Sequence, residues 1–129
     1  MADVRSPLLA LGALNAAISV GAGAFAAHGL RGRLDARALE VFETGARYQM
    51  YHAIAIVLAA VIAMCTATPG LARGAHIAGW IFQGGIIVFS GSLYVLSLSG
   101  VRAIGAVTPI GGVAFLAGWL WLAWSAWRG

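Results

Sequence analysis

Charged residues divide this chain into four long uncharged segments, and this spacing constrains the fold more than any other feature. The segments hold 103 of the 129 residues and comprise residues 6–30, 48–72, 74–101 and 103–127. An α-helix rises about 1.5 Å per residue, so roughly 20 apolar residues cross a hydrocarbon core about 30 Å thick. Each segment is therefore long enough to cross a membrane once and too short to cross it twice, which predicts four transmembrane helices.

The composition excludes a water-soluble bundle of the same length. Hydrophobic residues make up 61% of the chain and charged residues 9%, whereas soluble domains carry roughly 25% charged residues. A soluble four-helix protein also needs a polar outer face on each helix, and these segments lack one. We therefore expect an all-α membrane protein with a single domain over residues 1–129.

Local signals place the four spans at about residues 7–27, 48–65, 77–98 and 106–127. Ser6 is suited to cap the first helix and Pro7 to its first turn. Thr68-Pro69-Gly70 and Ser99-Gly100 mark turns. Because the connections on either side of the third span are short, consecutive spans must be antiparallel neighbours, which predicts an up-and-down bundle.

Residues 31–47 hold seven of the twelve charges and still have a helical pattern. Asp35 is a candidate N-cap, and apolar side chains after it recur on one helical face. This pattern predicts an amphipathic helix at about 36–45 that lies at the membrane interface and runs into the second span. The alternative is that this segment folds back onto the bundle.

All eight basic residues are arginines near the predicted span ends. The basic residues form no cluster of the kind that binds nucleic acid, so the expected partner is the lipid bilayer. Five arginines fall on the side that carries residues 31–47, and three on the side that carries both termini. The positive-inside rule then predicts both termini outside the cytoplasm. Aromatic residues near both faces, Tyr94 and Trp121 among them, predict interfacial belts.

Four motifs, in order along the chain, are similar to those of a known family. They are Gly-Ala-Phe-Ala-Ala-His-Gly-Leu at 23–30, Phe-Glu-Thr-Gly-Ala-Arg-Tyr-Gln-Met-Tyr-His-Ala at 42–53, Phe-Ser-Gly-Ser-Leu-Tyr at 89–94 and Thr-Pro-Ile-Gly-Gly at 108–112. The chain resembles the YgdD/YwdK-like family of small bacterial inner-membrane proteins, a domain-of-unknown-function family with a eukaryotic transmembrane relative. Ala26 stands where family members usually have glycine. The resemblance implies four spans and a bacterial inner (plasma) membrane location, and it implies no reaction.

The candidate site is a polar cluster of His28, Glu43, Gln49 and His52. His28 closes the first span and His52 opens the second, so both are expected near one membrane face. Two neutral imidazoles could ligate haem iron or another metal; alternatively, they hydrogen-bond Glu43, arginines or lipid head groups. Because the sequence has no close metal-ligand spacing such as His-Glu-x-x-His, no cofactor or metal is assigned.

Catalysis and proton-coupled transport are poorly supported. All four carboxylates, Asp3, Asp35, Glu40 and Glu43, lie outside the uncharged segments. General acid–base catalysis needs carboxylates or other titratable groups held across a site, and coupled export needs an ionisable group at membrane depth. We therefore expect a protein that is not an enzyme.

Small residues four apart suggest that the spans pack closely. Ala13, Ala17 and Gly21 form one stripe on the first span, and such spacing lets helix backbones approach in lipid. Asn15 and Ser19 on this span should face other helices rather than lipid. The favoured function is a non-catalytic packing or accessory component of a homo-oligomer or larger membrane complex. The alternatives are a small-molecule transporter or pore, and a haem membrane anchor.

Overall fold

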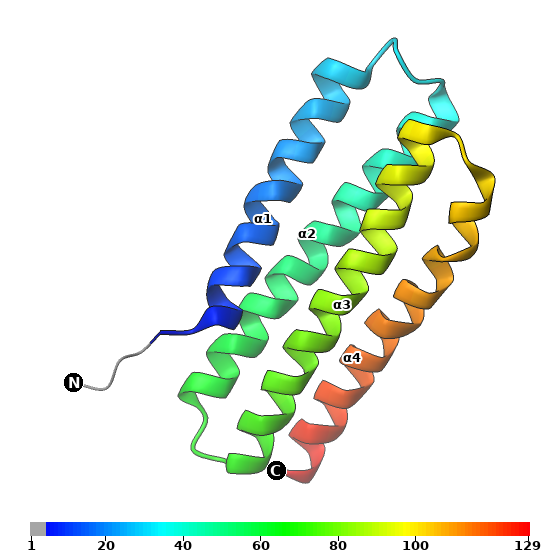
Figure 1. Cartoon of the computed structure of the whole chain (residues 1–129). Coiled ribbons are helices and arrows are strands. Elements are labelled where there is room, and N and C mark those ends of the chain that lie inside the picture. Colours follow the sequence, from blue (N-terminus) through cyan, green and yellow to red (C-terminus); the bar gives the residue numbers. More distant parts are fainter. Residues whose placement is uncertain (1–4) are drawn as a thin grey trace.

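The computed structural model describes residues 5–129, and this part of the chain is helical without a β-strand (Figure 1). Its elements are α1 (Pro7–Phe25), the π-helix η1 (Ala26–Leu30), α2 (Ala36–Cys65), α3 (Pro69–Ser99), the 3-10 helix η2 (Arg102–Ala106) and α4 (Thr108–Arg128). Four helical stretches, the first including η1 and the last η2, are long and apolar enough to cross a membrane. The predicted all-α, four-span architecture is confirmed.

Consecutive helices run antiparallel, so the start of α1 and the end of α4 lie at the same end of the bundle (Figure 1). α2 and α3 pack against each other in the centre, while α1 lies mainly against α2 and α4 against α3. The main core cluster lies among all four helices and includes Leu8, Ile56, Phe82 and Phe115. α1 and α4 are therefore the outer helices of an up-and-down bundle.

Helix starts follow the predicted chemistry. The Ser6 hydroxyl accepts the Leu9 N–H at 3.2 Å, and the Asp35 carboxylate accepts the Ala38 N–H at 2.8 Å. Each of these bonds satisfies a backbone donor that the first helical turn leaves without a partner. The N-caps predicted at these two positions are confirmed.

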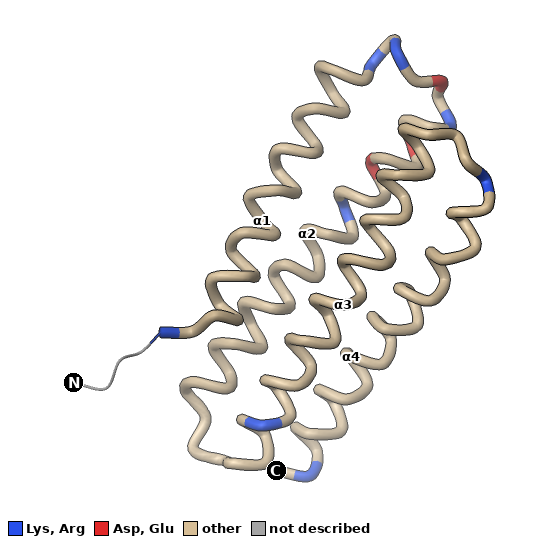
Figure 2. The backbone as a smooth tube through the Cα atoms, in the orientation of Figure 1, with Lys and Arg blue, Asp and Glu red and all other residues tan. Residues whose placement is uncertain are grey.

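The predicted amphipathic helix at 36–45 is the first part of α2, which continues unbroken from Ala36 to Cys65. Its apolar face packs onto the bundle: Phe42 is buried with Ala26 and Leu30, and its ring lies 4.8 Å from that of Tyr94. The charged residues of this segment lie at the same end of the bundle as η2 (Figure 2). The segment therefore runs into the second span as predicted, and its apolar face packs onto the bundle while its charged residues stay exposed.

Glycines allow α3 and α4 to approach very closely. A Cβ atom on Gly118 would lie 2.6 Å from the Phe82 ring, and one on Gly85 would lie 2.5 Å from the Phe115 ring. Side chains of one helix thus occupy the space that a methyl group would need on the other. Close backbone approach of this kind strengthens helix association in lipid, where apolar burial contributes little.

Candidate functional site

A chain of polar side chains links three helices inside the bundle. Asn15 on α1 donates from Nδ2 to the Gln83 Oε1 on α3 at 2.7 Å, and its Oδ1 accepts from the Gln49 Nε2 on α2 at 3.1 Å. Gln49 also accepts the Tyr94 hydroxyl of α3 at 2.6 Å. We call Asn15, Gln49, Gln83 and Tyr94 the central polar network. It joins α1, α2 and α3 through side chains alone.

The central polar network lies deep in the protein, and its groups satisfy one another. Asn15 and Gln49 are 5% and 4% exposed, and an unbonded amide at such positions costs roughly 1–3 kcal/mol. In the described part of the chain, no buried side-chain nitrogen or oxygen lacks a hydrogen-bond partner. The network therefore holds α1, α2 and α3 in register, and its buried polar atoms are hydrogen-bonded within the protein.

Two serines also hold the helices in register, through hydrogen bonds to the backbone of α2. Ser19 on α1 donates to the Ala46 carbonyl at 2.7 Å, and Ser90 on α3 donates to the Gly45 carbonyl at 2.8 Å. Both carbonyls belong to α2, so two consecutive residues of this central helix are bonded, one to α1 and one to α3. Asn15 and Ser19 both face other helices, as predicted.

His52 lies between α2 and α4 with both ring nitrogens engaged. Its Nδ1 lies 2.8 Å from the Tyr48 carbonyl oxygen, and its Nε2 lies 3.2 Å from the Trp119 indole nitrogen. A carbonyl can only accept and an indole N–H can only donate, so Nδ1 carries the proton and Nε2 is bare. The ring also stacks on Phe115 at a centroid distance of 3.5 Å. His52 is thus held as a neutral imidazole that bonds α2 to α4.

The structure divides the predicted polar cluster into two buried and two exposed residues. Gln49 and His52 are buried, whereas His28 and Glu43 are exposed. Ser19 pairs with the backbone of α2 at Ala46, so helical rise places His28 roughly 20 Å from His52 along the bundle axis. The two histidines therefore do not approach each other.

Other titratable residues do not assemble a metal site in the described part of the chain. No group of three or more His, Cys, Asp or Glu side chains is placed there to hold a metal ion. His76 lies at the other end of the bundle, in the first turns of α3, where its Nε2 accepts the Trp80 indole N–H at 3.1 Å. Like His52, it bonds an indole.

Sequence reasoning missed the partners in the central polar network. Gln83 is a polar residue within a predicted span, and its polarity indicates a side chain that faces another helix rather than lipid. Tyr94 was assigned to an interfacial belt, but its hydroxyl points inward to Gln49. Trp119 likewise reaches inward to His52. These pairings depend on the register between helices, which a single sequence does not specify.

The fold and its internal bonding define a small four-span helical membrane protein. The chain matches the family model described as a protein of unknown function (DUF423) over residues 22–112. It therefore belongs to this family, in agreement with the resemblance read from its motifs. No solved structure matches the chain.

Bacterial relatives cover most of the chain. It is 48% identical to a UPF0382 membrane protein of Staphylococcus saprophyticus over 112 residues, which are 87% of this chain and 89% of that protein. It is 46% identical to the UPF0382 membrane protein YwdK of Bacillus subtilis over 110 residues, 85% of this chain and 87% of that protein. Both relatives are named as membrane proteins.

Proposed function

We propose that this protein is a non-catalytic membrane component that packs against a second copy of itself through the outer face of α1. The observation that carries the proposal is a line of small residues that the rest of the chain leaves uncovered. We call it the small-residue face of α1; it consists of Ala10, Ala13, Ala17, Gly21 and Ala24, all exposed.

The two sides of α1 differ in what covers them. On the inner side, Gly12 lies so close to α2 that a Cβ atom there would be 2.8 Å from the Val57 side chain. On the outer side, a Cβ atom on Gly21 would have no neighbour within 4 Å. Small residues at this spacing favour close helix contacts in lipid. A two-fold symmetric pair would bring the same face of each copy together, and this is the commonest arrangement of homo-oligomers.

The internal bonding supports a structural role over a solute-binding role. The polar side chains that a solute path would need, in the central polar network and at His52, are engaged with each other, with the backbone or with Trp119. In addition, the carboxylates Asp35, Glu40 and Glu43 lie in the charged end of the bundle, within or next to the first turns of α2 (Figure 2). Packing thus accounts for the buried polar groups without a ligand.

Cysteine cross-linking in native membranes tests the self-association. In a Cys65→Ser background, Ala17→Cys is expected to form a disulfide-linked dimer under mild oxidation, because symmetry places the two copies of residue 17 together. Val113→Cys, on the exposed face of α4, is the matched control and should remain monomeric. Adding Gly21→Leu to Ala17→Cys should reduce the dimer several-fold by holding the helices apart.

Three results would contradict this proposal. They are equal cross-linking at residues 17 and 113, no dimer at residue 17, and cross-links from residue 17 to a different protein alone. The last result would assign the small-residue face to a larger complex.

We further propose that the protein lies in the bacterial inner membrane with both termini outside the cytoplasm. The bacterial relatives that are named as membrane proteins support the location. The distribution of arginine between the two ends of the bundle supports the orientation (Figure 2). One end carries Arg5, Arg73 and Arg128, and the other carries the remaining five. Positive charge favours the cytoplasmic side.

Fusions after Gly129 test the orientation. Alkaline phosphatase joined there is expected to be active, and green fluorescent protein joined at the same place should be dark, because the first requires export and the second fails to mature after it. A fluorescent fusion together with an inactive phosphatase would reverse the proposed orientation.

A further inference from the structure

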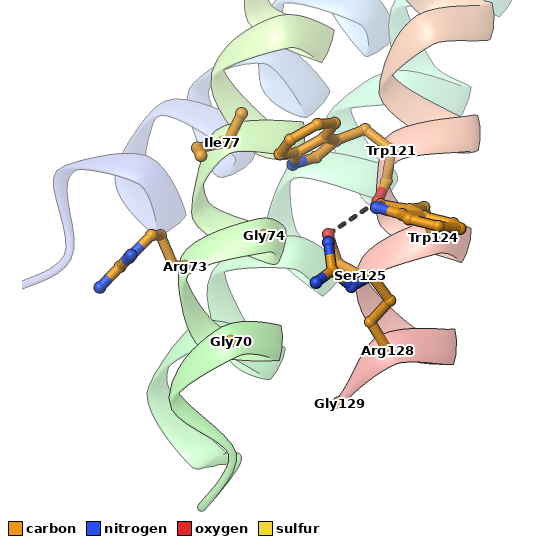
Figure 3. Close-up of a pocket in the computed structure, with 9 residues that line it drawn as sticks. All are labelled: Gly70, Arg73, Gly74, Ile77, Trp121, Trp124, Ser125, Arg128 and Gly129. Atoms are coloured by element: carbon orange, nitrogen blue, oxygen red, sulfur yellow. Dashed lines mark hydrogen bonds between the residues drawn. The ribbon is translucent and has the colours of Figure 1, made fainter.

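A groove of about 350 Å³ lies between the first turns of α3 and the last turns of α4. Figure 3 shows the residues that line it, among them Arg73 and Ile77 from α3 and Trp121, Trp124 and Arg128 from α4. It lies at the end of the bundle where α1 begins and α4 ends (Figure 1).

Close helix contact builds the floor of this groove. Gly74 lies against Ser125 so tightly that a Cβ atom on the glycine would overlap the serine side chain. The Ser125 hydroxyl is turned back onto its own helix, where it donates to the Trp121 carbonyl at 2.8 Å. Because the serine is bonded in this way, the polar side chains that remain available around the groove are the two guanidinium groups.

The charged side chains around the groove, Arg73 and Arg128, are both basic. Arg128 is held with its Cζ atom 5.4 Å from the centre of the Trp124 ring, and Figure 3 shows its side chain beside Trp124 and Ser125. Arg73 extends from the outer side of α3 in the same view. In the described part of the chain, the carboxylates Asp35, Glu40 and Glu43 all lie at the other end of the bundle (Figure 2), so they do not neutralise these arginines.

The rim of the groove is apolar and uncovered by protein. Ile77, Trp121 and Trp124 are 37%, 42% and 53% exposed. Tryptophan is enriched where the hydrocarbon core meets the head groups, and arginine at that depth contacts phosphate. Positive charge next to an exposed apolar rim matches one molecule with an anionic head and apolar tails.

We propose that this groove binds the head group of an anionic phospholipid. Arg128 contacts the phosphate while it remains over Trp124, and the long side chain of Arg73 swings across the groove to contact it from α3. The acyl chains descend along Ile77 and Trp121. A free phosphate would satisfy the arginines but would leave this apolar rim without a partner, so the lipid is the occupant.

Native mass spectrometry of the full chain, released from micelles with equal phosphatidylglycerol and phosphatidylcholine, tests this site. The wild-type protein is expected to retain phosphatidylglycerol in preference. Arg128→Gln should reduce the retained phosphatidylglycerol about five-fold. This factor corresponds to the contribution that one basic residue makes to binding at an anionic surface. Arg73→Gln with Arg128→Gln should abolish the preference.

Arg102→Gln, in η2 at the other end of the bundle, is the matched control and should retain the wild-type preference. If circular dichroism shows that the double variant is unfolded, the two single variants carry the comparison. An unchanged lipid ratio in Arg128→Gln and Arg73→Gln would overturn the proposal. Displacement of the lipid by millimolar glycerol phosphate would also overturn it, because the groove would then be a site for a soluble anion.

Discussion

Gly111→Ala is expected to destabilise the protein by about 1–3 kcal/mol relative to Gly112→Ala, the range that overpacking a close contact usually costs. A Cβ atom on Gly111 would overlap the backbone nitrogen of Phe89 and lie 2.7 Å from its Cα. Because a backbone cannot rotate out of the way as a side chain can, α3 and α4 must move apart. This separation would also loosen the contacts of Gly85 with Phe115 and of Gly118 with Phe82 farther along α4.

Gly112 provides a control in the adjacent position of the same helix. A Cβ atom there would come no closer than 3.9 Å to the Phe89 ring, which is an ordinary contact. Both substitutions gain the same helix propensity, about 1 kcal/mol for alanine over glycine, so the difference between them isolates the contact with Phe89. Denaturant unfolding in mixed micelles measures it. Equal stability of the two variants would show that α3 and α4 do not approach at Gly111.

Gln49→Leu is expected to be the most damaging change in the central polar network, at about 2 kcal/mol. The glutamine supplies the donor for the Asn15 Oδ1 and the acceptor for the Tyr94 hydroxyl. Leucine fills a similar volume but leaves both groups without their partner. An unsatisfied buried polar group costs roughly 1–3 kcal/mol. Hydrogen bonds between membrane helices contribute energies near the lower end of this range.

Gln83→Leu is the matched comparison and should cost less than half as much. Gln83 only accepts from the Asn15 Nδ2, and this nitrogen also donates to the Leu11 carbonyl at 2.9 Å within its own helix. Asn15 therefore keeps a partner when Gln83 is lost. The same unfolding measurement ranks the two variants, and a Gln83→Leu cost equal to that of Gln49→Leu would mean that the network does not centre on Gln49.

The sequence predicted the number and order of the helices, but it did not predict the full length of every helix. An uncharged segment marks the part of the chain that can cross the hydrocarbon core. The helix itself can extend beyond that core wherever its charged side chains are exposed. Arg37 and Arg47 are exposed on α2, so this helix begins at Ala36 and joins the amphipathic helix predicted at 36–45 to the span predicted at 48–65. In the same way, α3 begins at Pro69 and carries the exposed Arg73 in its early turns.

Individual polar residues were predictable, but their pairings were not. Asn15 and Ser19 had to face protein because exposing them to lipid is costly, and both do. Which partners they meet depends on register, and a shift of one residue turns a side chain about 100° around its helix. The two histidines show this dependence: position in the sequence placed them near one face, whereas the register buries His52 and leaves His28 exposed.

The mass of the particle extracted directly from native membranes tests the central proposal most directly. Extraction in lipid nanodiscs avoids detergent, which can separate weak helix contacts. The small-residue face of α1 predicts a particle with two copies of the chain, and it predicts that Gly21→Leu converts this particle to one copy. A wild-type particle with a single copy would contradict the proposed self-association.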